Sequence, residues 1–414
     1  MSVKERFLGE LKKIDVAKLT SDMVKIKSYS FMKDQEKEIA EYVYKFFKGE
    51  GIEANKYEIE PGRFNVVARI PGVGKKAGDK GTGAGTGAKS LMLSGHMDTV
   101  PAYDMKNPFS GDIRDGKVFG RGACDMKGPL ASMMAALAAI KRAGIELEGD
   151  LYFAGLADEE EQGKGAKYLV EHGPIATGTI MGEPSSLDMA LGHKGLEWIR
   201  VTIKGKKVHG GDVEHGVNAI QMAARYINKI YEEYVPVLSE REYPLLGKPT
   251  INIGTINGGD QPSTFPGECE IRLDRRCVPT ETIEQVYKEL EGIAEELHKQ
   301  DSRFNAKVED IFAGEELLPH LPFCTSQSDA LVQSVQKAKA SAKNPGDRQG
   351  ELSPVIAFPA WTDAGFIAAG TDSSCIVMGP GELGLAHSTS ECVAIKELEE
   401  AAYIYGMTAI DYCR

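Results

Sequence analysis

The stretch Leu91-Met-Leu-Ser-Gly-His-Met-Asp98 contains a pattern that recurs along the chain: a short apolar run that ends at polar side chains. The run that begins at residue 151 ends in the same way, at an acidic triplet that closes at residue 160. Segments with helical spacing of apolar residues follow these runs, at 126–144 and 164–172. Short apolar strands that alternate with helices predict an α/β domain with a mainly parallel sheet.

The pattern changes after residue 195. The sequence predicts strands at 196–204, 250–257, 268–274 and 304–311, and helices at 217–234 and 282–299. This β-α-β-β-α-β order is typical of a ferredoxin-like unit. A later apolar run at 376–378 and a helix at 396–412 resemble the first part of the chain again. We therefore expect an α/β domain formed by residues 1–194 and 313–414, with a ferredoxin-like α+β domain inserted at 195–312.

Composition excludes several classes of protein. The 414 residues are 42% hydrophobic and 27% charged, as in globular proteins, and the formal net charge is −12. A net-negative chain without a block of Lys and Arg argues against nucleic-acid binding. No apolar run is long enough to span a membrane, and the charged start of the chain lacks the apolar core of a secretory signal. Seven cysteines without a CxxC pair favour reduced thiols, hence a cytoplasmic protein.

The segment 71–90 is rich in Gly, Ala, Lys and Thr and predicts a surface loop. Its glycines do not make a phosphate-binding loop, because Gly87-Ala-Lys-Ser90 lacks the Gly-Lys pair and a strand, rather than a helix, follows. A nucleotide-binding enzyme is therefore a disfavoured alternative.

Polar residues follow four of the predicted strands, and another opens a predicted helix. They are His96 and Asp98, the triplet Asp158-Glu159-Glu160, Glu183, His387, and Asp125 at the start of the helix. Carboxyl ends of parallel strands share one edge of a sheet, where ligands bind. Each motif alone has an ordinary explanation, such as a turn or an acidic helix start. Their succession at strand ends favours one shared site.

Two histidines with several carboxylates suit Zn²⁺, Co²⁺ or Mn²⁺, and two ions sharing one carboxylate would use the whole set. His96 and Asp98 lie at i and i+2, so Asp98 is placed to fix the orientation of the imidazole ring. Glu159 and Glu160 face opposite ways in an extended chain. One of them can bind a metal while the other moves protons.

Several motifs together carry a family resemblance. They are Ser94-Gly-His-Met-Asp-Thr-Val-Pro101, Gly120-Arg-Gly-Ala-Cys-Asp-Met-Lys-Gly128, Asp158-Glu-Glu160, Gly182-Glu-Pro184 and Ala386-His387. The chain resembles the M20 metallopeptidase family, and within it the branch of acetylornithine deacetylases and succinyl-diaminopimelate desuccinylases. The resemblance implies a zinc-peptidase-like catalytic domain and an inserted domain that serves as a dimerisation lid.

The resemblance also implies a centre of two divalent metal ions, most often zinc, bridged by Asp125. His96 and Glu183 would complete the ligands of one ion, and Glu160 and His387 those of the other. It further implies a cis peptide bond after Asp125.

Roles for other residues follow from the same resemblance. Glu159 would be the general base, and Asp98 the partner of the metal-binding histidine at position 96. His209 would reach the active site of a neighbouring subunit in a homodimer. Arg276 would hold the substrate carboxylate, and Asn218 is a polar residue of the lid.

These features predict an enzyme that hydrolyses the amide bond of small N-acyl amino acids. A dipeptidase or other exopeptidase of the same family is the alternative. Two departures from the family pattern leave substrate preference open: Gly210-Gly211 follows His209, and Ser263 stands where Asn is common. A non-catalytic binding protein is disfavoured, because every metal and base position holds a competent residue.

Overall fold

The computed structural model describes residues 1–73, 88–314, 318–342 and 354–414. The predicted loop at 71–90 therefore lies mostly outside the described residues. The chain forms two compact units, which are described separately. The first comprises Met1–Gly192, Thr325–Phe358 and Thr362–Arg414, and the second His193–Cys324 and Pro359–Trp361.

The first unit contains a large sheet in the order β1-β2-β6-β3-β7-β15-β8, with β14 paired to β8. These strands are β1 (Glu53–Glu60), β2 (Arg63–Ile70), β3 (Leu91–His96), β6 (Leu151–Leu156), β7 (Gly178–Pro184), β8 (Met189–His193), β14 (Val355–Phe358) and β15 (Ser374–Gly379). The central strands β6, β3, β7 and β15 run parallel, whereas β2 and β8 join them antiparallel. Every residue of β3, β6 and β7 is buried, as expected for strands covered on both faces. The expected α/β fold with a mainly parallel centre is confirmed.

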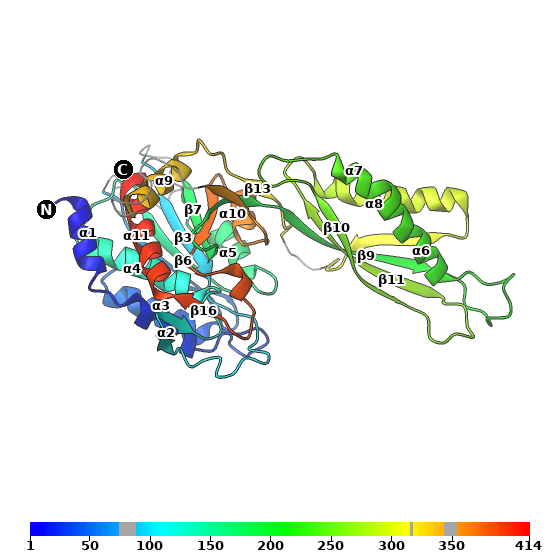
Figure 1. The fold of residues 1–414 in the computed structure, drawn as a ribbon, viewed down its shortest axis with the longest axis horizontal. Helices are drawn as coiled ribbons and strands as arrows, with labels where there is room; N and C mark the ends of the chain where they lie inside the picture. The colour runs from blue at the N-terminus through cyan, green and yellow to red at the C-terminus, as the bar shows by residue number, and fades with distance from the viewer. Residues whose placement is uncertain (74–87, 315–317, 343–353) are drawn as a thin grey trace. The chain divides into compact units, whose positions relative to one another are not determined.

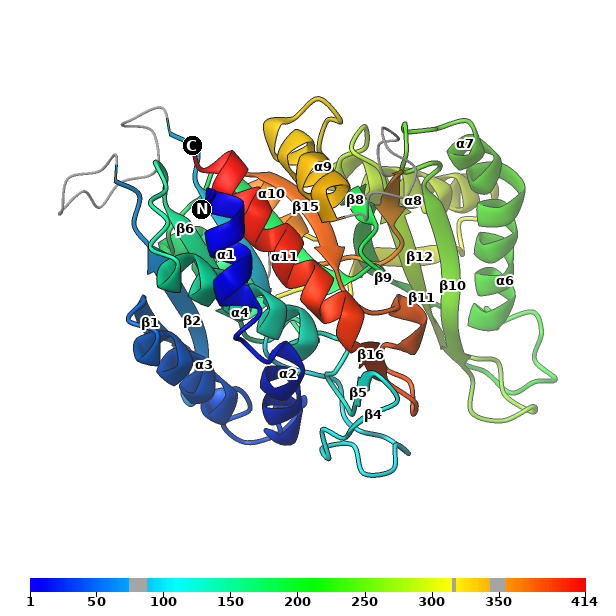
Figure 2. The ribbon, with the colours of Figure 1, turned by 60° about the vertical axis from the view of Figure 1, so that its left-hand side comes forward.

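Helices cover this sheet. They are α1 (Val3–Leu11), α2 (Val16–Lys25), α3 (Lys37–Gly49), α4 (Lys127–Arg142), α5 (Lys164–His172), α9 (Ala330–Ala342), α10 (Ala364–Gly370) and α11 (Ile395–Tyr412). α4 and α11 pack against each other on one face (Figure 2), where the Ser132 hydroxyl donates to the Leu398 carbonyl at 2.9 Å. α4 is rich in Ala, Met and Leu, and almost all of its residues are buried, so it is the central helix on this face of the sheet.

A small sheet in the first unit connects two loops that matter for function. Its strands are β4 (Ile113–Arg114), β5 (Lys117–Phe119) and β16 (Cys392–Ala394), in the order β16-β5-β4. β5 leads into the loop that carries Asp125. β16 follows the loop that carries His387 and a short 3-10 helix, Leu383–Leu385. Pairing of β5 with β16 therefore brings together two segments that are far apart in the sequence.

The second unit is an antiparallel sheet with helices on one side (Figure 1). Its strand order is β10-β11-β9-β12, from β9 (Gly195–Lys204), β10 (Thr250–Gly258), β11 (Glu268–Cys277) and β12 (Asn305–Asp310). The helices are α6 (Ala219–Lys229), a π-helical turn (Ile230–Tyr234), α7 (Val235–Ser239) and α8 (Ile283–Gln300), and the short strand β13 (Phe323–Cys324) ends the unit. Alternate residues of β11 are buried, which gives this unit a core of its own.

The buried carboxyl group of Glu197, on β9, should make the stability of the fold depend on pH. Its side chain is only 6% exposed and accepts a hydrogen bond from the Tyr287 hydroxyl at 3.2 Å. Burial and the nearby Asp310 raise the pKa of Glu197 to about 7 from 4.5. Between these values the unfolded chain loses the proton and the folded chain keeps it, so stability falls as pH rises. A shift of this size corresponds to at most about 3 kcal/mol.

Glu197→Gln removes this titration. We expect the melting temperature of the variant to exceed that of the wild type by several degrees at pH 8, and by clearly less at pH 5. Thermal unfolding followed by circular dichroism at both pH values measures the difference. An equal difference at the two pH values would show that the carboxyl of Glu197 titrates normally in the folded protein.

Candidate metal centre

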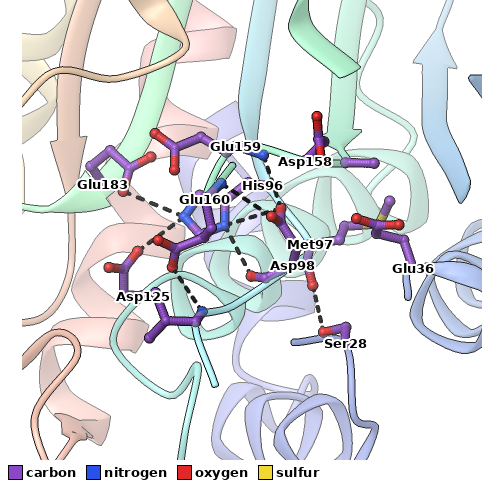
Figure 3. Close-up of polar contacts among 12 residues, drawn as sticks. Ser28, Glu36, His96, Met97, Asp98, Asp125, Asp158, Glu159, Glu160 and Glu183 are labelled. Carbon is purple, nitrogen blue, oxygen red and sulfur yellow. Dashed lines mark hydrogen bonds and ion pairs between the residues drawn. The ribbon is translucent and has the colours of Figure 1, made fainter. Parts of the chain in front are cut away.

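The parallel strands place the predicted polar residues at one edge of the sheet. His96 is the last residue of β3, and its register partner Leu156 is the last residue of β6. The triplet 158–160 therefore starts beside His96. Glu183 lies near the end of β7, which also pairs with β3 (Figure 3). The structure thus brings together the side chains that the strand-end pattern singled out.

The carboxylate of Asp125 lies between two histidines. Its Oδ1 is 3.0 Å from Nε2 of His96, and its Oδ2 is 3.2 Å from Nε2 of His387. The same His387 nitrogen is 3.2 Å from the Glu160 carboxylate, and Nε2 of His96 is 3.7 Å from Oε2 of Glu183. The candidate ligand atoms of His96, Asp125 and Glu160 all lie within 4.8 Å of one another. One carboxylate thus faces two histidines, each of which has a second carboxylate nearby.

Most of this cluster is buried. His96 is 1% exposed and Asp125 8%, whereas the side chain of His387 is half exposed. Among the described residues, Glu183 Oε1 is a buried oxygen without a hydrogen-bond partner. A buried group of carboxylates with an unsatisfied oxygen is costly unless a cation compensates it. Imidazole nitrogens and carboxylate oxygens are the ligands that Zn²⁺ and similar ions use, so the residues present fit divalent metal ions.

The pKa shifts describe the same environment. Burial raises the pKa of Glu183 to about 7, although His96 opposes the shift. Burial lowers the pKa of His96, but Glu183 and Asp125 outweigh it and raise the pKa well above 6.5. Hydrogen bonds to Asp125 and Glu160 raise the pKa of His387 to about 10. The carboxylates thus stabilise positive charge at this place.

A cis peptide bond joins Asp125 to Met126, as the family resemblance implies. The end of the Met126 side chain lies close to two glycines, one on β3 and one on β7. A Cβ at Gly95 would lie 2.1 Å from Met126 Cε. A Cβ at Gly182 would lie 2.3 Å from Met133 Cε and 2.9 Å from Met126 Cε, so a side chain at either position would require these methionine side chains to move.

Asp98 contacts both His96 and the acidic loop 158–160. Nδ1 of His96 donates to the backbone carbonyl of Asp98 at 3.0 Å and is 3.6 Å from its carboxylate. The carboxylate also accepts the backbone N–H groups of Glu159, at 3.3 Å, and Glu160, at 3.1 Å. Asp98 therefore contacts the imidazole ring of His96 through both its backbone and its carboxylate, and its carboxylate also holds the acidic loop (Figure 3).

The two adjacent glutamates point in different directions. Glu160 turns towards Asp125 and also accepts the Val100 N–H at 3.2 Å, whereas the carboxyl of Glu159 lies near Glu183 (Figure 3). Burial raises the pKa of Glu159 well above 4.5, and the negative charge of Glu183 adds to the shift. Glu159 is therefore suited to carry a proton near neutral pH.

Two features of this region were not anticipated. Arg63 binds Asp158 at 2.6 Å and Glu36 at 2.8 Å, which anchors the acidic loop from behind. Asp363 is buried, and neither of its carboxylate oxygens has a hydrogen-bond partner among the described residues. Burial raises its pKa well above 3.8, and Asp98 and Glu183 add to the shift. An apolar run at 355–358 precedes Asp363, so the strand-end signal could have identified it.

The remaining predicted site residues lie in the second unit. His209 is exposed, and its Nδ1 accepts the Gly211 N–H at 3.1 Å. Asn218 caps α6, since its Oδ1 accepts the Gln221 N–H at 3.0 Å. Arg276 makes two hydrogen bonds to the Asp274 carboxylate, at 2.8 and 3.0 Å. Their roles in catalysis or substrate binding stay predictions.

Comparison with known proteins shows the family of the chain. The family described as Peptidase family M20/M25/M40 matches residues 92–411. The chain is 27% identical to a probable succinyl-diaminopimelate desuccinylase of Staphylococcus epidermidis, over 92% of this chain and 93% of that protein. It is 30% identical to an acetylornithine deacetylase of Myxococcus xanthus, over 80% of this chain and 82% of that protein.

Solved structures share the fold. An aminopeptidase from Bacillus cereus has a TM-score of 0.74 at 21% identity, covering 99% of both chains. A Bacillus subtilis protein described as a dinuclear metal binding peptidase has a TM-score of 0.67 at 16% identity, covering 97% of this chain and 98% of that one.

The chain belongs to the M20 peptidase family. It is a metallopeptidase or amidohydrolase that cleaves amide bonds. Within the part of the chain that the structure describes, none of the helices combines the length and apolarity needed to cross a membrane.

Proposed function

We propose that this enzyme removes the acyl group from small N-acyl amino acids, as an acetylornithine deacetylase or a succinyl-diaminopimelate desuccinylase does. The names of its curated relatives support this substrate class. The observation that carries the chemistry is the Asp125 carboxylate, which presents one oxygen to each of two histidines. A dipeptidase or other exopeptidase is the second candidate, because a structural neighbour is named an aminopeptidase.

Two divalent ions, zinc first and cobalt or manganese as alternatives, fit the ligand set. His96 and Glu183 would hold one ion, Glu160 and His387 the other, and Asp125 would bridge them. When bound, such ions polarise the amide carbonyl and lower the pKa of a water molecule towards neutrality.

Glu159 performs the proton transfers in this proposal. It takes a proton from the attacking water as the water oxygen bonds to the amide carbon. The C–N bond then breaks, and Glu159 gives the proton to the leaving nitrogen, so the products are a carboxylic acid and an amine. Two structural features support this role: burial raises the pKa of Glu159, and Asp98 holds its backbone N–H.

Three residues of the second unit would bind the substrate. Arg276 already holds a carboxylate with two hydrogen bonds, that of Asp274, and its planar guanidinium suits the carboxylate of an amino acid in the same way. His209 would act across a homodimer and donate to the developing oxyanion, a contact typically worth about 2.7–4 kcal/mol. Asn218 would add a polar contact near the substrate.

The second unit also offers a surface for a homodimer. β10 lies at one edge of its sheet, and most of its residues are exposed, with Ile256 49% exposed. An edge strand presents unpaired N–H and C=O groups that a second copy can bind. We place the dimer in the cytoplasm, and the seven free cysteines support this location.

A substrate panel tests the proposed function. The metal-reconstituted enzyme is assayed with N-acetyl-ornithine, N-succinyl-diaminopimelate, several N-acetyl amino acids and unblocked dipeptides. We expect turnover of at least one N-acyl amino acid, and no turnover of it by Glu159→Ala. Turnover of dipeptides alone would replace the deacylase proposal by the peptidase alternative, and no turnover of any substrate by the metal-loaded enzyme would contradict both.

A further inference from the structure

A buried ion pair joins the two loops that carry Asp125 and His387. β5 pairs with β16 so that Phe119 lies opposite Cys392, and Gly120 donates its N–H to the Glu391 carbonyl at 3.1 Å. Glu391 therefore stands beside the start of the Asp125 loop, although it belongs to the His387 loop. Figure 2 shows the two short strands side by side.

The carboxylate of Glu391 binds the backbone of the Asp125 loop. Its Oε1 accepts the N–H groups of Cys124, at 3.0 Å, and of Asp125 itself, at 3.1 Å. Its Oε2 pairs with the guanidinium of Arg121. The side chain is fully buried, so these contacts are shielded from water. Glu391 thus fixes the backbone position from which the Asp125 side chain projects.

Arg121 extends the pair to two more segments. Its Nη2 lies 3.4 Å from the backbone carbonyl of His387, and its Nε donates to the Pro101 carbonyl at 3.2 Å. Arg121 is 1% exposed. The single ion pair therefore contacts the backbone of both Asp125 and His387, which come from distant parts of the sequence.

A gain in folding stability does not by itself explain a buried ion pair at this position. Desolvation of two buried charges commonly offsets their attraction, so apolar residues of similar volume stabilise a fold about as well. Groups that orient metal ligands, by contrast, typically change metal affinity about 10–100-fold when they are mutated. The contacts of Arg121 and Glu391 with two ligand-bearing loops favour this second role.

We infer that Arg121 and Glu391 are positioning residues that set the metal affinity of the site. Neither side chain is among the proposed ligands; they hold the backbones of Asp125 and His387 so that both ligands stand ready before a metal ion arrives. This inference rests on the proposed metal ligands. The new element is that the affinity for the metal also depends on the buried Arg121–Glu391 ion pair, which contacts the backbone of these ligands.

The second unit supplies a matched control. Arg275 and Glu281 also form a fully buried ion pair, and Glu281 Oε2 accepts the backbone N–H of Val278 at 3.1 Å. Arg241 also donates to Glu281 Oε1, at 2.7 Å. The contacts otherwise resemble those of Arg121 with Glu391, but they lie in the unit without the proposed metal ligands. Glu281→Gln and Glu391→Gln should therefore perturb folding alike and differ in metal binding.

The experiment measures zinc affinity by competition with a chromophoric chelator, after circular dichroism has shown that each variant is folded. We expect Glu391→Gln to bind zinc about 10–100-fold more weakly than the wild type. Glu281→Gln should keep the wild-type affinity, although both substitutions lower the melting temperature. Arg121→Lys keeps the positive charge but loses the planar guanidinium group, so it should also weaken zinc binding. This variant tests the inference if Glu391→Gln does not fold.

Wild-type affinity in both Glu391→Gln and Arg121→Lys would overturn the inference, as would an equal loss in Glu281→Gln. Failure of the proposed metal centre is distinguishable, because the wild type itself would then bind no zinc in the same titration. Activity is not needed for any of these measurements.

Discussion

Glu159→Ala is expected to lower kcat by about 10²–10⁴-fold while the protein keeps its divalent ions. Glu159 lies beside the proposed metal ligands, but its carboxyl turns away from Asp125, towards Glu183 (Figure 3). The substitution would remove the proposed general base and leave the proposed ligand set complete. The measurement is kcat on the best substrate of the panel, together with metal content by mass spectrometry.

Glu161→Ala is the control for this prediction, because Glu161 is an exposed glutamate two positions further along the same loop. It should keep both activity and metal. Turnover by Glu159→Ala close to that of the wild type would remove Glu159 from the mechanism. Loss of metal from Glu159→Ala would instead make it a ligand and end its role as the general base.

Asp125→Ala is expected to have the largest effect on metal binding. Its two carboxylate oxygens face His96 and His387, so in the proposed centre its removal would take a ligand from both ions at once. We expect the loss of both ions from dialysed protein and of all measurable hydrolysis. The affinity for zinc should fall by more than roughly 100-fold, the upper end of the loss that is typical when a residue that orients a metal ligand is mutated.

Glu183→Ala gives the contrast that tests bridging. Of the two histidines in the cluster, His96 is the one that pairs with Glu183, so removal of Glu183 should release one ion and leave the second bound. Asp104→Ala, at an exposed position, should release none. Equal metal loss from Asp125→Ala and Glu183→Ala would contradict a bridging role for Asp125.

The sequence predicts the elements of the fold that have strong apolar patterns. The helix expected at 164–172 is found as α5, the strands β3 and β6 begin where apolar runs begin, and β11 begins at the predicted residue 268. β1 was not predicted, because it is an exposed edge strand of mainly polar residues, Glu53-Ala-Asn-Lys-Tyr-Glu-Ile-Glu60, held by its pairing with β2. The helix expected at 217–234 is interrupted by a π-helical turn, which its apolar spacing does not reveal.

For the candidate site, too, the sequence predicts some residues and not others. Strand ends locate His96, Glu160 and Glu183, because parallel strands end at one edge of a sheet. The pair of Arg121 with Glu391 was not predictable, since it depends on the pairing of β5 with β16 across most of the chain. The additional contacts of the Asp98 carboxylate with the acidic loop depend on local geometry that residue spacing does not determine.

The most direct test of the metal centre is a crystal structure of the zinc-loaded protein with anomalous data at the zinc absorption edge. The account predicts two anomalous peaks about 3.5–4 Å apart, with the Asp125 carboxylate between them. One peak should lie against His96 and Glu183, and the other against Glu160 and His387. A single peak, or two peaks that do not share Asp125, would contradict the account.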